Sequence, residues 1–189
     1  MTTDPHPWAT TLDGLHAQVW LRLVRGVADR RAPARHPTLA TVSPDGWPEA
    51  RTVVLRAADP VTATLDLHTD LRSAKVAALQ AMPRAALHIW DQTAHLQIRL
   101  MADVTILTGD SVAATWAKVP ETSRRTYTMT PAPGHPIPTA LNYQPTPDQP
   151  FFAVLRCTVQ AMDILHLGPE HRRAAFDQAT GWAGTWLSP

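Results

Sequence analysis

The sequence has little of what secreted, membrane-bound and disulfide-stabilised proteins need. Cys157 is the only cysteine, so no intrachain disulfide forms and nothing asks for an oxidising compartment. No apolar run approaches the roughly 20 residues that span a bilayer. The segment Met1–Trp8 shows no basic region followed by an apolar core, which a signal peptide requires. We therefore expect a soluble, cytoplasmic protein without a membrane partner.

Lysine and glycine are also scarce. The chain has 17 basic residues, of which only Lys75 and Lys118 are lysines, and its net charge is +1 with a pI near 8.1. Such a balanced charge does not indicate nucleic acid as a partner. The eight glycines form neither a Walker nor a Rossmann fingerprint, and no G-x-S-x-G motif is present. The common nucleotide-binding and hydrolase motifs are thus excluded.

Nine histidines raise the question of a metal site. His88 and His95 fall on either side of an expected hairpin turn, and His166 and His171 flank another. No two histidines stand at i, i+4 on a helix, and no cluster of cysteine and carboxylate accompanies them. Cys157 lies among apolar neighbours in an expected strand, which is typical of an inert buried thiol. The sequence therefore predicts no metal and no cysteine nucleophile.

The hydrophobic pattern predicts one domain of mixed structure. At 189 residues and 44% hydrophobic content, the chain is long and apolar enough for a substantial core. We divide it into an N-terminal arm and amphipathic helix at 1–36 and a main domain at 37–189. Alternating segments predict strands at 38–43, 49–56, 64–69, 85–91, 95–101, 102–107, 151–165 and 171–178, with helices at 11–31, 73–82 and 110–119.

Antiparallel hairpins with inserted helices favour a mainly β, α+β fold that closes wholly or partly into a barrel. The segment 131–150 is rich in proline and has no periodicity. Proline-rich loops of this length tend to be functional or flexible, and the sequence leaves both roles open.

The stretch Arg51–Lys75 holds the candidate binding site. It reads R-T-V-V-L-R, then a turn, then L-D-L-H-T-D-L-R-S-A-K, which predicts two strands leading into a helix with Ser73 as its N-cap. A helix start carries unpaired N–H groups and partial positive charge, which suits a phosphate. Convergence of Arg51, Arg56, Arg72 and Lys75 would make an anion site, whereas the alternative is a set of solvated charges on a hairpin and a surface helix.

These two motifs resemble the flavin mononucleotide (FMN) signature of the pyridoxamine 5′-phosphate oxidase-like family. Further segments follow in the family's order from about Pro37 onward: the strand with Gln97, W-A-K-V-P-E-T-S-R at 116–124, D-I-L-H-L-G-P-E-H-R-R, and the ending from Trp182 to Pro189. The resemblance implies an FMN-binding split β-barrel, a homodimer with FMN at the subunit interface, and a small-molecule substrate.

The resemblance also implies roles for individual residues. Arg51 and Lys75 would hold the flavin phosphate, with Ser73 nearby. His68 and Thr69 would lie at the ring and the ribityl chain, and Gln97 would reach the flavin from a neighbouring strand. The remaining implied cofactor contacts are Thr52, Val53, Val54 and Leu55, whose backbone would run along the isoalloxazine ring, together with Arg56 and Arg72.

Arg56 stands where the true oxidases carry a lysine that contacts substrate. Ser123 or Arg124 would approach the site from the other subunit. The sequence departs from the family pattern at four positions. Ala74, Ala175 and Trp186 stand where the family has arginines, and Leu165 stands where it has a tryptophan that contacts flavin.

The resemblance therefore implies that flavin binding is kept while recognition of the phosphate of the B6 substrate is eroded. We expect an FMN-dependent oxidoreductase whose catalytic residues the sequence does not name. Two alternatives stay open: a non-catalytic flavin-binding carrier or sensor, and a split barrel that binds haem or another cofactor.

Overall fold

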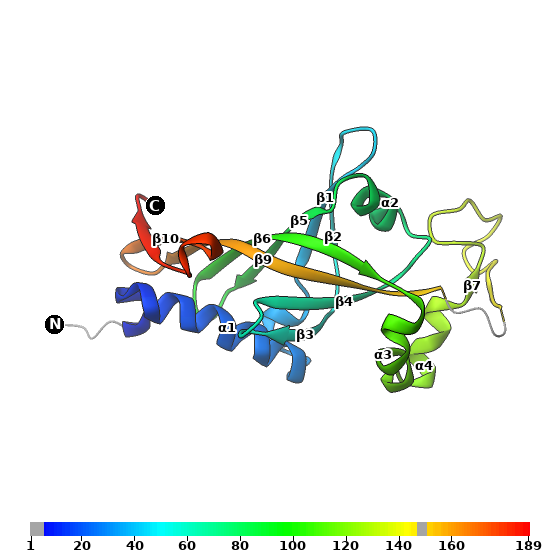
Figure 1. Ribbon diagram of the computed structural model, residues 1–189, viewed down its shortest axis with the longest axis horizontal. Coiled ribbons are helices and arrows are strands. Elements are labelled where there is room, and N and C mark those ends of the chain that lie inside the picture. Colours follow the sequence, from blue (N-terminus) through cyan, green and yellow to red (C-terminus); the bar gives the residue numbers. More distant parts are fainter. Residues whose placement is uncertain (1–5, 147–150) are drawn as a thin grey trace.

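A computed structural model describes residues 6–146 and 151–189 (Figure 1). Its main element is a nine-stranded sheet with the order β11-β10-β9-β6-β5-β1-β2, from which β3 and β4 branch through the pairing of β4 with β9. All pairings within this sheet are antiparallel, so the α+β prediction is confirmed. The strands are β1 (Thr38–Val42), β2 (Pro48–Thr52), β3 (Leu55–Asp59), β4 (Thr64–Asp70), β5 (Arg84–Asp91), β6 (Leu96–Leu107), β9 (Phe152–Leu167), β10 (His171–Asp177) and β11 (Gly184–Leu187).

The predicted single strand at 49–56 is two strands that diverge. β2 stays at the edge of the sheet beside β1, whereas β3 pairs with β4. The amide of Val53 donates to the carbonyl oxygen of Pro37 at 3.0 Å, which extends the pairing with the β1 side by one residue before the chain leaves it. β2 and β3 are not paired in the part of the chain that the structure describes, so the sheet does not close and the barrel is split.

β9 is the longest strand and joins the parts of the sheet. One of its edges pairs with β6, and its other edge pairs first with β4 and then with β10. A bulge opposite Met101 and Ala102 adds Gln160 to β9 as an extra residue. Because side chains alternate along a strand, the extra residue lets Val159 and Met162 both face the core.

Helix α1 (Leu12–Ala28) covers the branch of the sheet that contains β3. The hydroxyl of Thr11 accepts from the amide of Gly14 at 3.1 Å and caps the helix. The buried face of α1, which includes Leu15, Val19 and Leu23, packs into the same core as the strands. The N-terminal helix is thus part of the main hydrophobic core, and a second, smaller cluster forms around Tyr127 and Phe152.

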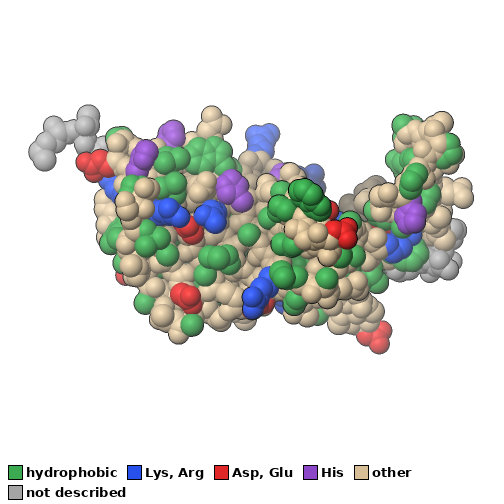
Figure 2. All heavy atoms as spheres, turned by 90° about the horizontal axis from the view of Figure 1, so that it is seen from above, with side chains coloured by type: hydrophobic (Ala, Val, Ile, Leu, Met, Phe, Trp, Pro, Cys, Tyr) green, Lys and Arg blue, Asp and Glu red, His purple; other side chains and the backbone are tan. Residues whose placement is uncertain are grey.

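The remaining helices are α2 (Ala74–Ala81), α3 (Ala113–Lys118) and α4 (Glu121–Arg124), with the 3-10 helices Pro7–Thr10, Pro33–Arg35, Gly109–Val112, Arg125–Tyr127 and Gln178–Thr180. The strands β7 (Met129–Thr130) and β8 (Gln144–Pro145) form a separate short pair. Of these elements, α3, α4 and β7 lie together at the end of the molecule away from the N-terminus (Figure 1). The proline-rich segment lies between β7 and β8 and stands away from the body (Figure 2), and its last residues, 147–150, are outside the described part. None of the described helices is long and apolar enough to cross a membrane.

Candidate functional site

The first part of the site lies where β4 runs into α2. Thr69 and Ser73 are both buried, and their hydroxyl oxygens lie 3.2 Å apart. The Lys75 ammonium donates to Thr69 Oγ1 at 3.2 Å. Ser73 occupies the N-cap position of α2, but the prediction that its side chain caps the helix is wrong, because its hydroxyl turns toward Thr69 and makes no cap hydrogen bond. The start of α2 therefore has two hydroxyls and an ammonium beside it and no capping side chain.

Arg51 of β2 brings a second cation to the same place. Its Nη1 donates to Thr41 Oγ1 at 2.6 Å, and its Nη2 pairs with Glu49 Oε2 at 2.5 Å. Burial lowers the pKa of Lys75, and the nearby Arg51 guanidinium lowers it further, whereas Asp70 opposes the shift. The structure thus brings Arg51, Lys75, Thr69 and Ser73 together as a cradle, in which two cations repel each other over buried hydroxyls.

Arg72 lies at the start of α2 and makes several contacts within the chain. Its guanidinium makes a two-pronged ion pair with Asp70, at 3.0 and 2.7 Å, and donates to the carbonyl oxygen of Met129 at 2.7 Å. It also lies 3.4 Å from the ring centroid of Phe151. Arg72 therefore ties the start of α2 to both ends of the proline-rich segment, and these hydrogen bonds use its Nε and Nη2 groups.

The second part of the site is a cavity of about 350 Å³ beyond the break between β2 and β3. Arg56 of β3, His68 of β4 and Ser123 of α4 line it, so the structure brings these three predicted residues together. Arg56 Nε is buried and has no hydrogen-bond partner among the described residues. Burial, followed by the neighbouring Arg56, lowers the pKa of His68 to about 4, while Asp66 acts in the opposite direction. His68 is therefore a neutral imidazole at pH 7.

Sequence reasoning missed two basic residues of this cavity, Arg35 and Lys118. Arg35 lies in the 3-10 helix Pro33–Arg35 and donates to the carbonyl oxygen of Val27 at 2.7 Å. The carboxylate that lines the cavity, Asp66, is held by both prongs of Arg156 at 2.9 Å. The cavity therefore carries an excess of positive charge. No local motif marks Arg35 or Lys118, because each reaches the cavity from a separate element.

Arg124 does not line this cavity. Its Nε donates to the carbonyl oxygen of Val119 at 2.9 Å, and its Nη2 donates to those of Trp116 and Ala117. It thus satisfies the free carbonyl groups at the end of α3, a structural use for a basic side chain. Ser123 is the member of this predicted pair that faces the cavity.

Gln97 lies on the opposite face of the sheet from the cradle. Arg51 is in register with Leu39, and the ladder continues through Leu87 to Leu100 on the core face. Gln97 lies an odd number of positions from Leu100 and so points outward, where His88 Nε2 lies 3.4 Å from its Oε1. In one chain, Gln97 and the cradle do not converge.

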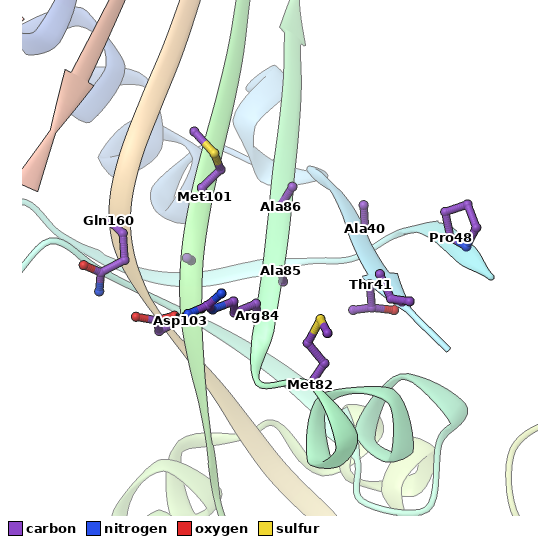
Figure 3. A pocket seen from close by; sticks show the side chains of 12 residues that line it. Ala40, Thr41, Pro48, Met82, Arg84, Ala85, Ala86, Met101, Asp103 and Gln160 are labelled. Carbon is purple, nitrogen blue, oxygen red and sulfur yellow. Dashed lines mark ion pairs between the residues drawn. The ribbon is translucent and has the colours of Figure 1, made fainter. Parts of the chain in front are cut away.

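The outward face carries an apolar groove of about 560 Å³ (Figure 3). Ala40, Ala86 and Met101 lie side by side across β1, β5 and β6, and Gln160 enters from β9. The groove also reaches Thr41, whose hydroxyl accepts from Arg51. It therefore begins at the rim of the cradle and extends over the side of the sheet that bears Gln97.

The predicted site backbone at Thr52, Val53, Val54 and Leu55 spans the break between β2 and β3. It runs from the cradle, at Arg51, to the cavity, at Arg56, so it connects the two parts of the site. Among the described residues, no group of three or more histidine, cysteine or acidic side chains is placed to hold a metal ion. Burial raises the pKa of Cys157 to about 12, which leaves its thiol protonated and unreactive.

Comparison with known proteins supports the resemblance. The family model described as pyridoxamine 5′-phosphate oxidase, FMN-binding domain, matches residues 7–108. A pyridoxine/pyridoxamine 5′-phosphate oxidase of Microcystis aeruginosa is 41% identical over 85 residues, which cover 45% of this chain and 38% of that protein. The chain thus aligns with well under half of the length of that relative. Pyridoxine/pyridoxamine 5′-phosphate oxidase 2 of Arabidopsis thaliana is 24% identical over 93% of this chain and 100% of its own length.

Solved structures agree on the fold. A pyridoxamine 5′-phosphate oxidase-related, FMN-binding protein of Nostoc punctiforme superposes with a TM-score of 0.74 and 27% identity, covering 92% of this chain and 96% of its own. PhzG of Burkholderia lata, solved with tetrahydrophenazine-1-carboxylic acid, has a TM-score of 0.68 at 18% identity and covers 98% and 94% of the two chains. With more than half of its length matched by the family model and this split-barrel fold, the chain belongs to the pyridoxamine 5′-phosphate oxidase FMN-binding family.

Proposed function

We propose that the protein binds FMN and uses it to oxidise or reduce a small molecule. The observation that carries the proposal is the cradle at the start of α2. There Lys75, Thr69 and Ser73 are held together, Arg51 lies close enough to depress the pKa of Lys75, and no side chain caps the helix. A phosphate dianion offsets the repulsion between the two cations and accepts hydrogen bonds from the hydroxyls and the first amides of the helix.

The chain's own residues bind and orient the cofactor. Arg51 and Lys75 hold the phosphate, and the isoalloxazine ring lies along the backbone from Thr52 to Leu55, which runs from the cradle towards the cavity. When bound, FMN supplies two-electron redox chemistry, which belongs to the cofactor rather than to the protein. Neutral His68 borders the ring as a hydrogen-bonding group without charge.

The cavity that Arg56 lines is our candidate for the substrate site. Its basic residues, Arg35, Arg56 and Lys118, favour a substrate with an anionic group. Arg56 Nε is buried without a partner, and a donor in that state is costly until a ligand accepts from it. Ser123 adds a hydroxyl on the opposite wall. Oxidation of pyridoxamine or pyridoxine phosphate remains the narrower form of this proposal.

We further propose a homodimer with FMN at the subunit interface. The cradle and Gln97 lie on opposite faces of one sheet, so only a second copy brings a Gln97 to the flavin. The groove over Ala40, Ala86 and Met101 provides an apolar surface for that second copy, and it starts at Thr41 beside the cradle. Small side chains in this row let another sheet approach closely.

The test is a titration of the purified protein with FMN, followed by flavin absorbance and fluorescence. We expect a yellow complex in the wild type and loss of that complex in the Arg51→Met/Lys75→Met variant. A titration that leaves the absorbance and fluorescence of FMN unchanged would contradict the proposal, and a haem spectrum of the purified protein would favour the other cofactor. A bound flavin that no donor or acceptor reduces or oxidises would favour the carrier or sensor.

A further inference from the structure

Two features project from the body of the protein and expose apolar side chains. One is the turn between β1 and β2, which rises from the sheet (Figure 1) and carries Trp47, a residue that is 74% exposed. The other is formed by residues 129–145, from β7 to β8, and stands away from the body (Figure 2). We call residues 129–145 the arm. Its Leu141 and Tyr143 are 79% and 47% exposed, and apolar side chains that gather on one exposed feature mark an interaction site.

The arm encloses a cavity of about 360 Å³. The lining of this cavity includes Met129, Pro131, Pro133, Ile137 and Tyr143. None of residues 129–145 is Asp, Glu, Lys or Arg, although such residues make up 17% of the chain. A lack of charged side chains is typical of the centre of a protein interface. The arm thus has the composition of a surface that another protein covers.

Hydrogen bonds at the base of the arm hold it in shape. β7 and β8 pair there, and the amide of Thr146 donates to the carbonyl oxygen of Thr128 at 2.7 Å. Arg72 fixes the same base through the carbonyl oxygen of Met129. The five prolines of the arm restrict its backbone further. A cavity that is formed in advance in this way loses little conformational entropy when it is filled.

Trp47 is also held in a fixed position. Its amide donates to Ser43 Oγ at 3.0 Å, and the amide of Ser43 donates to the carbonyl oxygen of Trp47 at 2.8 Å. Gly46, at a φ of +85°, supplies the left-handed backbone that this tight turn needs. An exposed tryptophan on a rigid turn has the properties of an interface hot spot, because it can bury a large apolar area without ordering a flexible segment.

We propose that Trp47 of each subunit inserts into the arm cavity of the other subunit in a homodimer. The cavity has room for one aromatic side chain, and its proline and tyrosine rings offer flat apolar walls for an indole. Under two-fold symmetry each subunit gives one Trp47 and one arm, so the contact is made twice. This inference rests on the proposed homodimer and not on FMN binding.

Two further observations favour a second copy of the chain as the occupant of the cavity. Asp45 lies in the same exposed turn as Trp47, and His135 lines the cavity, so insertion brings a carboxylate close to an imidazole that can donate to it. Pro48, the residue after Trp47, lines the apolar groove that we propose as the dimer surface, so the insertion extends that surface without a break. Within one chain Trp47 remains 74% exposed and therefore does not fill the cavity of its own arm.

The first measurement is the dissociation constant of the dimer, obtained by sedimentation equilibrium. A hot-spot side chain contributes a factor of roughly 30 or more in affinity, and the dimer contains two such contacts. We therefore expect Trp47→Ala to raise the dissociation constant by at least about a hundredfold. Tyr143→Ala, in the wall of the cavity, should raise it in the same direction. Val61→Ala is the matched control and should leave the constant unchanged, because Val61 lies in the turn between β3 and β4 and is 91% exposed.

A cross-link tests whether the contact joins two subunits. One chain carries Trp47→Cys, the other carries Tyr143→Cys, and two different affinity tags isolate the mixed dimer. One of its two contacts keeps the native Trp47 and Tyr143 and holds the dimer together, while the other contact brings the two new thiols face to face. A short bismaleimide should therefore link the two chains covalently. The wild type and each single variant alone should stay free of cross-links, because their new thiols have no partner thiol in the contact and Cys157 is buried and protonated.

Two results would overturn the inference while the dimer itself remains. One is a Trp47→Ala dimer as tight as the Val61→Ala dimer, and the other is a mixed dimer that the bismaleimide does not link. A wild type that is monomeric at every concentration would refute the proposed homodimer, and this inference with it, while the FMN titration still decides the proposed cofactor. A dimer that depends on Trp47 but binds no FMN would refute the proposed redox function and leave this inference in place.

Discussion

Replacement of Lys75 by methionine separates the function of the cradle from its contribution to stability. The ammonium of Lys75 is partly buried, it donates to Thr69, and Arg51 lies close enough to lower its pKa. A lowered lysine pKa means that folding disfavours the charged form, so at pH 7 the charge reduces the free energy of unfolding. Methionine has a similar length and no charge. The protein without FMN should therefore unfold at the same urea concentration as the wild type, or at a higher one.

FMN binding should change in the opposite direction. A hydrogen bond to a charged group contributes about 1.5–3 kcal/mol, and each 1.4 kcal/mol is a factor of ten in affinity. Lys75→Met should thus raise the dissociation constant for FMN by roughly 10- to 150-fold. Fluorescence titration gives the dissociation constant, and urea unfolding without FMN gives the stability.

Arg25→Met is the matched control, because it removes one positive charge from an exposed site on α1, where the side chain is 70% exposed. It should leave both FMN affinity and stability nearly unchanged, since exposed ion pairs contribute little. An unchanged dissociation constant in Lys75→Met would refute the cradle as the phosphate site. A large loss of stability without FMN would refute the argument that the two cations repel each other there.

Three further measurements probe other parts of the molecule. Arg72→Leu leaves the buried carboxylate of Asp70 without its ion-pair partner, so the free energy of unfolding measured in urea should fall by about 3 kcal/mol. Proteases should also cut the proline-rich segment sooner, because the contact of Arg72 with Met129 is lost. The pKa of His68 is about 4 in the folded state and 6.5 in the unfolded state, so the unfolded chain binds more protons between these two pH values. The free energy of unfolding of the wild type should therefore fall by an amount on the order of 3 kcal/mol as the pH drops from 6.5 to 4. His68→Gln should lose less stability over that range, and His135→Gln, at an exposed position, should lose as much as the wild type. Equal pH dependence in the wild type and both variants would contradict the pKa argument. Leu100→Ala in the core should lower the free energy of unfolding by about 2–5 kcal/mol. Met101→Asp, at the next residue and in the groove, should leave the fold intact and raise the monomer fraction in sedimentation. A dimer that Met101→Asp does not weaken would exclude the groove as the interface.

Much of the fold follows from local patterns in the sequence. The apolar spacing of residues 11–31 predicts α1, and the alternation in 85–91 and 95–107 predicts β5 and β6. The break at Val53 has no such signal, because both flanking segments alternate in the same way. It arises from the pairing of β3 with β4, which is a tertiary contact.

The candidate site divides in the same way. Arg51, Ser73 and Lys75 lie in two motifs within 25 residues of sequence, so the sequence identifies them together. Arg72 contacts the carbonyl group of Met129 in a distant loop, and Arg124 contacts carbonyl groups at the end of α3. Both kinds of contact compete with any ligand and leave no trace in a motif. The outward direction of Gln97 follows only from the register of β6, and Arg35 comes to the cavity through the packing of α1.

The position of β9 also has a consequence for synthesis of the chain. β4 and β6 both need β9 as a neighbour, and the pairing of Thr64 with Thr158 joins residues more than ninety positions apart. While the ribosome makes the chain, both strands have an unpaired edge until β9 emerges, and exposed edges of this kind promote aggregation. Contacts so distant in sequence also slow folding. We therefore expect the nascent chain to depend on chaperones until its last quarter has been made, and a protein truncated before residue 152 to be insoluble.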